Sequence, residues 1–423
     1  MTAERRSEVI VVGGGPAGAA TAWALAKNGV DVLVLDRAHF PRAKPCAEYL
    51  SPEAARLLNE MGALAPLEAE GATTLGGMRV HVRDQSFEGR FAGAHRWRGF
   101  RDRGLAVRRE RLDALLLDGA RAAGAGVEEG VRVLDLIRDA NGRVTGVAAD
   151  RSGIREEFRA AHVVGADGLR SVVARRLGLA RRLRWPERYA FVTHYSGVSG
   201  VGDCGEMHVF DDGYCGLAPV GGGVVNVAVV TSATGALDAS GDSVGFLERW
   251  LAHHPSLATR LTAAERVAAV QVTGPFASRA RRAWAAGASL VGDAADFYDP
   301  FTGEGIYAAL RGAELMTPYV VEALRAPDAL RAAHSLAAYD RCRRHEFGGK
   351  WALERLVSIA VAHPALLARV AVRLRERCDL ADLLVGVTGD FVPVREVLNL
   401  RYAAALLGPG ASHQVAAASA GAA

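Results

Sequence analysis

The chain has 423 residues, half of them hydrophobic, and a formal net charge of +4. This length allows two or three domains with a large buried core, and so small a charge argues against a nucleic-acid partner. Five cysteines without paired metal-ligand spacing, no signal peptide and no apolar run of about 20 residues predict a cytoplasmic protein with no metal site, disulfide framework or integral membrane segment.

A glycine-rich turn near the start of the chain carries the first chemical signal. The pattern predicts a strand over residues 8–12, a helix from Pro16 to Lys27 and a second strand over 31–35. Gly13 allows a sharp turn, Gly15 lets a pyrophosphate approach the backbone, and Gly18 lets the helix pack closely on the strand. Asp36 then follows the second strand, where a carboxylate would accept hydrogen bonds from an adenosine ribose. The segment predicts a dinucleotide site.

The middle of the chain alternates between two kinds of pattern. We expect a strand over 75–82, an amphipathic helix over 109–123, a hairpin with strands 131–137 and 144–149 around Asn141-Gly142, and a strand over 162–164. From about 185 to 275 the sequence is β-rich, with strands expected over 207–210, 214–219 and 224–230. This sheet would roof the cofactor. Residues 306 to about 406 are expected to be mostly helical, and 408–423 to form a disordered tail.

Two further glycine signatures follow expected strands. In GADGLRS, Asp167 stands between small residues and can contact the phosphate–sugar region of a cofactor, although Asp-Gly is also a common turn. The strand over 289–291 ends at Gly292-Asp293, which places a carboxylate for ribityl hydroxyls. Residues 300–305 then form a tight loop that opens the helix from Ile306, whose positive end would face the pyrimidine edge of a flavin.

In this order, the three signatures resemble the FAD-dependent oxidoreductases of the aromatic-hydroxylase fold over roughly residues 8–320, and most of all the geranylgeranyl reductases. The segment KPCAEYLSP at 44–52 is similar to the KPCG loop of those reductases, and DPFTGEGIYAAL at 299–310 resembles their PxTGEGI helix start. Ala47 replaces the glycine of that loop, and YCGLAP at 214–219 lacks the Trp and Phe of their YxWxFP strand. The WxWxIP segment of the related halogenases is not found.

The resemblance implies an α/β fold in which a Rossmann-like FAD-binding domain of the glutathione-reductase type is interleaved with a β-sheet substrate domain. We expect residues 1–75, 100–180 and 276–330 to form the FAD-binding domain. Residues 76–99 and 181–275 would form the substrate domain, and 331–407 a C-terminal helical region.

The implied activity is reduction of a carbon–carbon double bond in a lipophilic small molecule, a prenyl or polyketide-like secondary metabolite, by hydride from FADH2. An NAD(P)H-dependent monooxygenase, acting as a hydroxylase or epoxidase through a C4a-hydroperoxyflavin, is the alternative. A halogenase and a non-catalytic flavoprotein are further readings. The sequence shows no second GxGxxG, so NAD(P)H is expected to bind transiently, or a separate flavin reductase supplies electrons.

Individual residues follow from the signatures and from the resemblance. Cys46 and Tyr298 are the catalytic candidates, although Cys46 could also be a small buried side chain. Tyr49, Tyr214 and His208 are the substrate candidates, and an ordinary sheet surface would also explain His208. The expected FAD contacts are Gly13, Gly15, Pro16, Ala17, Gly18, Asp36, Arg37, Arg42, Lys44, Cys46, Ala47, Arg109, Ala166, Asp167, Gly168, Gly292, Asp293, Pro300, Gly303, Glu304, Gly305 and Ile306.

Overall fold

The structure is a computed structural model that describes residues 5–94, 96–239 and 241–407, so the predicted tail at 408–423 lies outside the described residues. Its first sheet has a parallel core in the order β21-β11-β1-β2-β8. Strands covered on both faces are apolar throughout, as residues 9–12 are. Val12, Gly165 and Leu290 are neighbours in register, so the three signatures meet at the carboxyl edge of this sheet.

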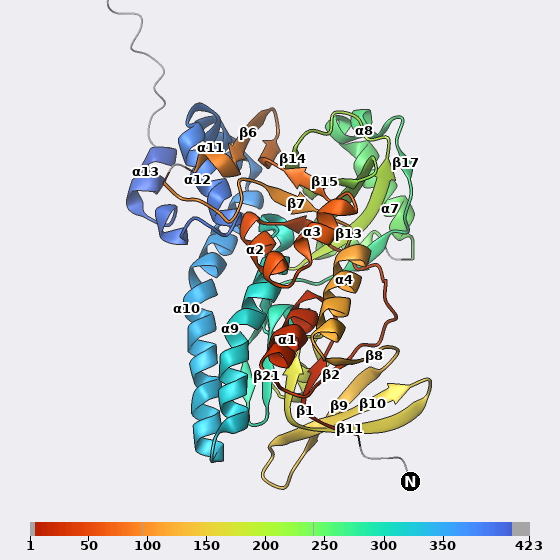
Figure 1. Cartoon of the computed structure of the whole chain (residues 1–423). Coiled ribbons are helices and arrows are strands. Elements are labelled where there is room, and N and C mark those ends of the chain that lie inside the picture. The colour runs from red at the N-terminus through yellow and green to blue at the C-terminus, as the bar shows by residue number, and fades with distance from the viewer. Residues whose placement is uncertain (1–4, 95, 240, 408–423) are drawn as a thin grey trace, which may run out of the picture.

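The first sheet and its helices have the following bounds: β1 (Arg5–Val12), α1 (Pro16–Lys27), β2 (Val32–Leu35), α4 (Arg109–Ala122), β8 (Gly126–Glu128), β9 (Arg132–Arg138), β10 (Val144–Arg151), β11 (Ile154–Gly165), β20 (Trp284–Ala285), β21 (Ala288–Leu290) and α9 (Gly305–Arg325). Strands β9 and β10 extend β11 as an antiparallel layer at the end of the molecule where the chain starts, away from α1 and α4 (Figure 1). The helix that starts at Pro16, the hairpin around Asn141-Gly142 and the helix at 109 are confirmed.

A second sheet lies over the carboxyl edge of the first, and we call it the roof sheet. Its order is β17-β13-β16-β15-β14-β5-β6, with β18 beside β13. The bounds are β5 (Gly77–Val82), β6 (Gln85–Arg90), β13 (Arg188–Ser196), β14 (Cys204–Phe210), β15 (Gly213–Gly221), β16 (Val224–Ser232), β17 (Glu265–Arg266) and β18 (Gln271–Thr273). The strand expected over 75–82 is confirmed over Gly77–Val82 as β5, whereas Leu75 ends the separate strand β4 (Thr73–Leu75). Gly76 separates the two strands, and its N–H donates to the Asp203 carbonyl at 2.7 Å.

Different helices pack on the two faces of the roof sheet. Leu217 and Val227 face α7 (Ser243–His253) and α8 (Pro255–Leu261), two helices that lie inside a region predicted as β-rich. Tyr214 and Val230 face the opposite way and pack with residues of α10 (Ala329–Val361), α11 (Pro364–Glu376) and α12 (Cys378–Thr388). Figure 1 shows α9 and α10 side by side, so the C-terminal helices connect both sheets.

Shorter elements complete the described chain: β3 (Tyr49–Leu50), α2 (Pro52–Glu60), α3 (Leu64–Ala69), β4 (Thr73–Leu75), β7 (Gly104–Ala106), α5 (Val172–Arg176), β12 (Ala180–Arg182), α6 (Ala233–Leu237), β19 (Ser278–Ala280), β22 (Asp296–Phe297) and α13 (Leu400–Leu407), with 3-10 turns η1 (Phe91–Gly93), η2 (Gly292–Ala294), η3 (Pro300–Thr302) and η4 (Val394–Glu396). Within the described ranges, no individual helix has the length and apolar character to cross a membrane. Helices α10 and α11 meet that test only as a pair bent by 111°.

Candidate functional site

The first glycine turn is shaped by two close backbone approaches and one open position. A Cβ at Gly13 would lie 2.6 Å from the Ala166 carbonyl oxygen, and one at Gly18 would lie 1.8 Å from the Gly13 carbonyl oxygen. Neither position can hold a side chain. At Gly15 the nearest atom to such a Cβ is Nη2 of Arg42, at 3.5 Å. The backbone of Gly15 therefore faces open space bordered by a guanidinium, as a pyrophosphate requires.

Asp36 closes this turn on the side expected for the ribose. Its buried carboxylate accepts the N–H of Gly14 at 2.6 Å and the N–H of Ala38 at 2.8 Å. Arg37, next in sequence, is exposed. Pro16 and Ala17 are buried at the start of α1, and a Cβ at Gly292 would lie 2.9 Å from Cβ of Ala17. The first and third signatures are therefore in contact.

Basic residues from two segments gather around one carboxylate. Asp113 accepts two hydrogen bonds from Arg109, at 2.7 and 2.8 Å, and pairs with Arg42 at 3.0 Å. Burial opposes the charge of Arg109, but Asp113 and the neighbouring Cys46 outweigh it, so the pKa of Arg109 is raised. Burial, followed by the charge of Arg109, lowers the pKa of Lys44, and the charge of Asp293 opposes this effect. Arg42 and Lys44, both expected from the sequence to contact the cofactor, therefore lie in one cluster with Arg109.

The second signature contributes one unsatisfied buried acceptor. Oδ2 of Asp167 accepts the N–H groups of Val172 and Val173, at 2.6 and 3.3 Å, whereas Oδ1 is buried without a hydrogen-bond partner. Burial raises the pKa of Asp167 despite these bonds. A Cβ at Gly168 would lie 3.7 Å from Nζ of Lys44, so the second signature reaches the basic cluster. A buried acceptor of this kind suits a hydroxyl donor of a bound molecule.

The third signature forms a tight loop before α9. Gly303 has a φ of 73°, and a Cβ there would lie 2.6 Å from Cδ1 of Tyr49, so Tyr49 packs directly on the loop. Glu304 is buried and Gly305 begins α9, with Ile306 buried in its first turn. The free N–H groups of this helix start face the loop region. Taken together, the open backbone at Gly15, the orphaned oxygen of Asp167 and the basic cluster fit FAD.

Asp299 connects the third signature to the roof sheet. Its Oδ1 accepts the Tyr214 hydroxyl at 2.7 Å and the Phe301 N–H at 3.1 Å, and its Oδ2 accepts from Arg188 at 2.7 Å. Arg188 also donates to Oγ of Ser358 on α10 at 3.0 Å. Burial, followed by the charge of Asp299, raises the pKa of Tyr214 well above its usual range. Tyr214 therefore lies at the loop as a neutral hydrogen-bond donor.

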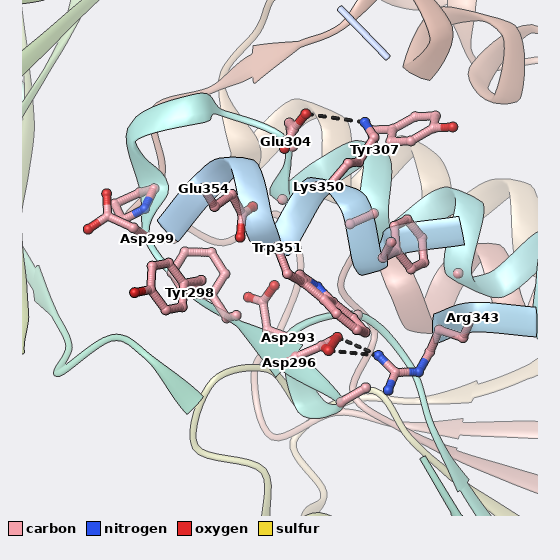
Figure 2. Close-up of a pocket in the computed structure, with 18 residues that line it drawn as sticks. Asp293, Asp296, Tyr298, Asp299, Glu304, Tyr307, Arg343, Lys350, Trp351 and Glu354 are labelled. Atoms are coloured by element: carbon pink, nitrogen blue, oxygen red, sulfur yellow. Dashed lines mark hydrogen bonds and ion pairs between the residues drawn. The ribbon is translucent and has the colours of Figure 1, made fainter. Parts of the chain in front are cut away.

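A polar cavity lies between the third signature and α10 (Figure 2). Its volume of about 60 Å³ is enough for a few water molecules and too small for a prenyl chain. Lys350 pairs with Glu304 at 3.2 Å, and burial raises the pKa of Glu354 well above its usual range, with Glu304 adding to the effect. Tyr298 and Asp293 also line it. This cavity is therefore a small space between the loop and α10, and it is not a site for a prenyl chain.

The Cys46 loop is tied to the roof sheet through Glu48 by His194 and Asn226, two residues that the sequence alone did not indicate. The Glu48 N–H donates to Sγ of Cys46 at 3.3 Å, and the Glu48 side chain is buried. His194 on β13 and Asn226 on β16 lie 2.7 and 3.1 Å from Oε2 of Glu48. Asn226 is a polar residue in the apolar run VVNVAVV, which is the one sequence signal that could have singled it out. Ala47 lies within the same loop, partly buried.

His208 does not share a pocket with Tyr214, which corrects the expectation that both line the substrate site. Tyr214 pairs with Val209 in the sheet register, whereas His208 pairs with Cys215 on the opposite face. There His208 and His81 lie near Glu206, with the three ligand atoms within 4.8 Å of one another. Nη1 of Arg260 also contacts Glu206 at 2.5 Å, so a guanidinium already neutralises this carboxylate.

Comparisons with known proteins agree with this geometry. The family described as FAD binding domain matches residues 6–345. Digeranylgeranylglycerophospholipid reductase 2 of Methanopyrus kandleri is 30% identical over 91% of this chain and 93% of its own length. The menaquinone reductase of Mycobacterium tuberculosis is 29% identical over 93% of both chains. A flavoprotein/dehydrogenase structure from Cytophaga hutchinsonii, 20% identical, superposes over 95% of both chains with a TM-score of 0.81. The fold class predicted from the sequence is confirmed.

Proposed function

Since the chain belongs to the FAD binding domain family and is an FAD-dependent oxidoreductase, we propose that it reduces a carbon–carbon double bond of a lipophilic small molecule. Bound FAD supplies the hydride when it is reduced. The chain's own task is then to hold the alkene, exclude water and give a proton to the second carbon.

The observation that carries this proposal is the position of Cys46. Its thiol lies beside Arg109 in the basic cluster and accepts the Glu48 N–H at 3.3 Å. A thiol fixed by two donors next to the expected cofactor can transfer a proton to a carbon of the substrate and be stabilised as the thiolate afterwards. Tyr298 lies just before the loop that opens α9, and burial raises its pKa, so it remains a neutral phenol.

The substrate class is inferred from two lines of support. The curated relatives are named as reductases of a geranylgeranylated phospholipid and of menaquinone, both of which carry prenyl chains. The roof-sheet face that bears Tyr214 has an apolar centre formed by Met207, Val209 and Val230, with the polar residues Arg188, His194 and Asn226 also on this face. Such a centre would exclude water from an alkene. We propose NAD(P)H, binding transiently, or a separate flavin reductase as the electron source.

The test is to reduce the FAD-loaded protein without oxygen and to add geranylgeranyl diphosphate or menaquinone in separate runs. Reoxidation of the flavin together with a product two hydrogens heavier would support the proposal. Cys46→Ala should slow this reoxidation by about a hundredfold or more, the range expected for loss of a general acid. Cys378→Ala, at an exposed cysteine of α12, should leave the rate unchanged.

The competing activity is oxygen transfer by a monooxygenase. If the reduced protein leaves the alkenes unchanged, and instead consumes O2 in proportion to substrate and yields a hydroxylated product, the reductase proposal is wrong. FAD-free protein that fails to bind added FAD would contradict the cofactor assignment itself.

A further inference from the structure

We propose that Glu48, His194 and Asn226 form a latch through which the roof sheet positions Cys46. The role of Cys46 in this inference rests on the proposed function, whereas the latch rests on contacts alone. Glu48 lies two residues from Cys46 in the loop. His194 and Asn226 lie on the neighbouring strands β13 and β16 of the roof sheet.

Every polar atom of the Glu48 carboxylate is engaged. Oε1 accepts the backbone N–H of Arg109 at 2.8 Å, and Oε2 lies 2.7 Å from Nε2 of His194 and 3.1 Å from Nδ2 of Asn226. Because an ionised carboxylate only accepts hydrogen bonds, the His194 ring must carry a hydrogen on Nε2. The carboxylate thus joins the loop to α4, β13 and β16 at once.

Asn226 uses both hydrogens of its amide. One is donated to Oε2 of Glu48 at 3.1 Å, and the other to the backbone carbonyl of Cys46 at 2.9 Å. His194 and Asn226 are directly opposite each other in the β13–β16 register, so their side chains lie on the same face of the sheet. The backbone of Cys46 is therefore held from the roof sheet directly.

The loop needs such a restraint because Glu48 has a φ of 60°. This left-handed region is unfavourable for a residue other than glycine, so such a residue persists there only where its surroundings impose the conformation. Five hydrogen-bond contacts to Glu48 and Cys46 impose it here, including the Val107 N–H, which donates to the Glu48 carbonyl at 3.1 Å. The strained turn directs the Glu48 N–H at Sγ of Cys46, which is the contact that fixes the thiol.

The chain offers a matched control on the other face of the same sheet. Glu206 and His208 also form a buried carboxylate–imidazole pair, with 3.0 Å between Oε2 and Nε2. That pair faces away from the Cys46 loop. A variant that breaks the Glu206–His208 pair also loses a buried carboxylate–imidazole contact, but it leaves the latch intact.

The experiment measures the rate at which iodoacetamide alkylates each cysteine of the FAD-loaded protein, resolved by peptide mass spectrometry. The variant Asn226→Asp keeps the size of the side chain but replaces its N–H donors to Glu48 and to the Cys46 carbonyl by a carboxylate oxygen. The variant His194→Leu removes the imidazole donor to Glu48. Each should raise the alkylation rate of Cys46 by about tenfold or more, the factor associated with one hydrogen bond to a charged group. His194→Gln retains a donor and should restore a rate near that of the unmodified protein.

Two internal references separate positioning from general loosening. Cys378 is exposed and reports reagent activity, and Cys215 is buried in the roof sheet and reports opening of that sheet. His208→Leu, which breaks the Glu206–His208 pair, should leave the alkylation rate of Cys46 unchanged. The proposal is overturned if Asn226→Asp leaves Cys46 as protected as before, or if Cys215 becomes reactive in parallel with it. With an accepted substrate, the latch variants should lower kcat more than they change KM.

Discussion

His162 makes stability depend on pH at the level of one residue. It is buried in β11, with Nε2 3.0 Å from Oγ of Ser289, and burial together with Arg143 lowers its pKa from 6.5 to about 3. Between these two values the unfolded chain binds a proton that the native protein does not, so stability falls as pH falls through this window. When pH is lowered from 7.5 to 5, the unmodified protein should lose about 2 kcal/mol more of its free energy of unfolding than His162→Asn does. Urea denaturation at both pH values measures it. Equal losses in both proteins would contradict the expectation.

Gly18 is the residue on which the cofactor site depends most sharply. A Cβ there would lie 1.8 Å from a backbone oxygen, so Gly18→Ala must move α1 away from the turn. We expect this variant to purify without the yellow colour of bound FAD. Gly119→Ala is the control, because a Cβ at this position of α4 has its nearest contact at 3.9 Å. Retention of FAD by Gly18→Ala, judged by absorbance, would show that the turn tolerates the shift.

At the scale of elements, Asp299 ties the 3-10 turn η3 to β13 and β15. Asp299→Asn keeps the size of the side chain but leaves Arg188, which is largely buried, without its carboxylate. We expect a loss of about 3–5 kcal/mol in the free energy of unfolding, as for other broken buried pairs. Asp118→Asn removes an exposed partner of Arg121 and should cost less than about 1 kcal/mol. Similar losses in the two variants, measured by denaturant unfolding, would argue against a buried role for Asp299.

Elements defined by local chemistry could be predicted from the sequence, and those that depend on distant partners could not. The spacing of Gly13 and Gly18 after an apolar strand is a local pattern that indicates a tight turn into a helix, so the first turn was predictable. A helix end was expected at His253 and His254 before Pro255, but the extent of α7 and the whole of α8 were missed because the strands around them dominate the pattern of that region. His194 and Asn226 gain their role from Glu48, which lies 146 and 178 positions away in sequence. No local signal connects such residues.

At the scale of the whole molecule, the expected FAD site joins segments from the first residues of the fold to residue 306. A ligand that binds only the native protein stabilises it, by about 2.7 kcal/mol at a hundredfold excess over its Kd. We expect FAD-free protein to unfold at a lower temperature and to recover with added FAD. Calorimetry of both forms measures this. The same unfolding temperature with and without FAD would contradict an FAD site that spans these segments.

The parallel sheet also has a consequence for how the protein is made. Strand β11 pairs on one side with β1 and on the other with β21, which ends at Leu290. A ribosome must therefore synthesise about two thirds of the 423 residues before β11 gains its second parallel neighbour. Until then the growing chain carries an unpaired, apolar strand edge, which is the kind of surface that associates with other chains. Release from the ribosome before β21 emerges should yield chains that aggregate or bind chaperones, whereas release after α9 should not.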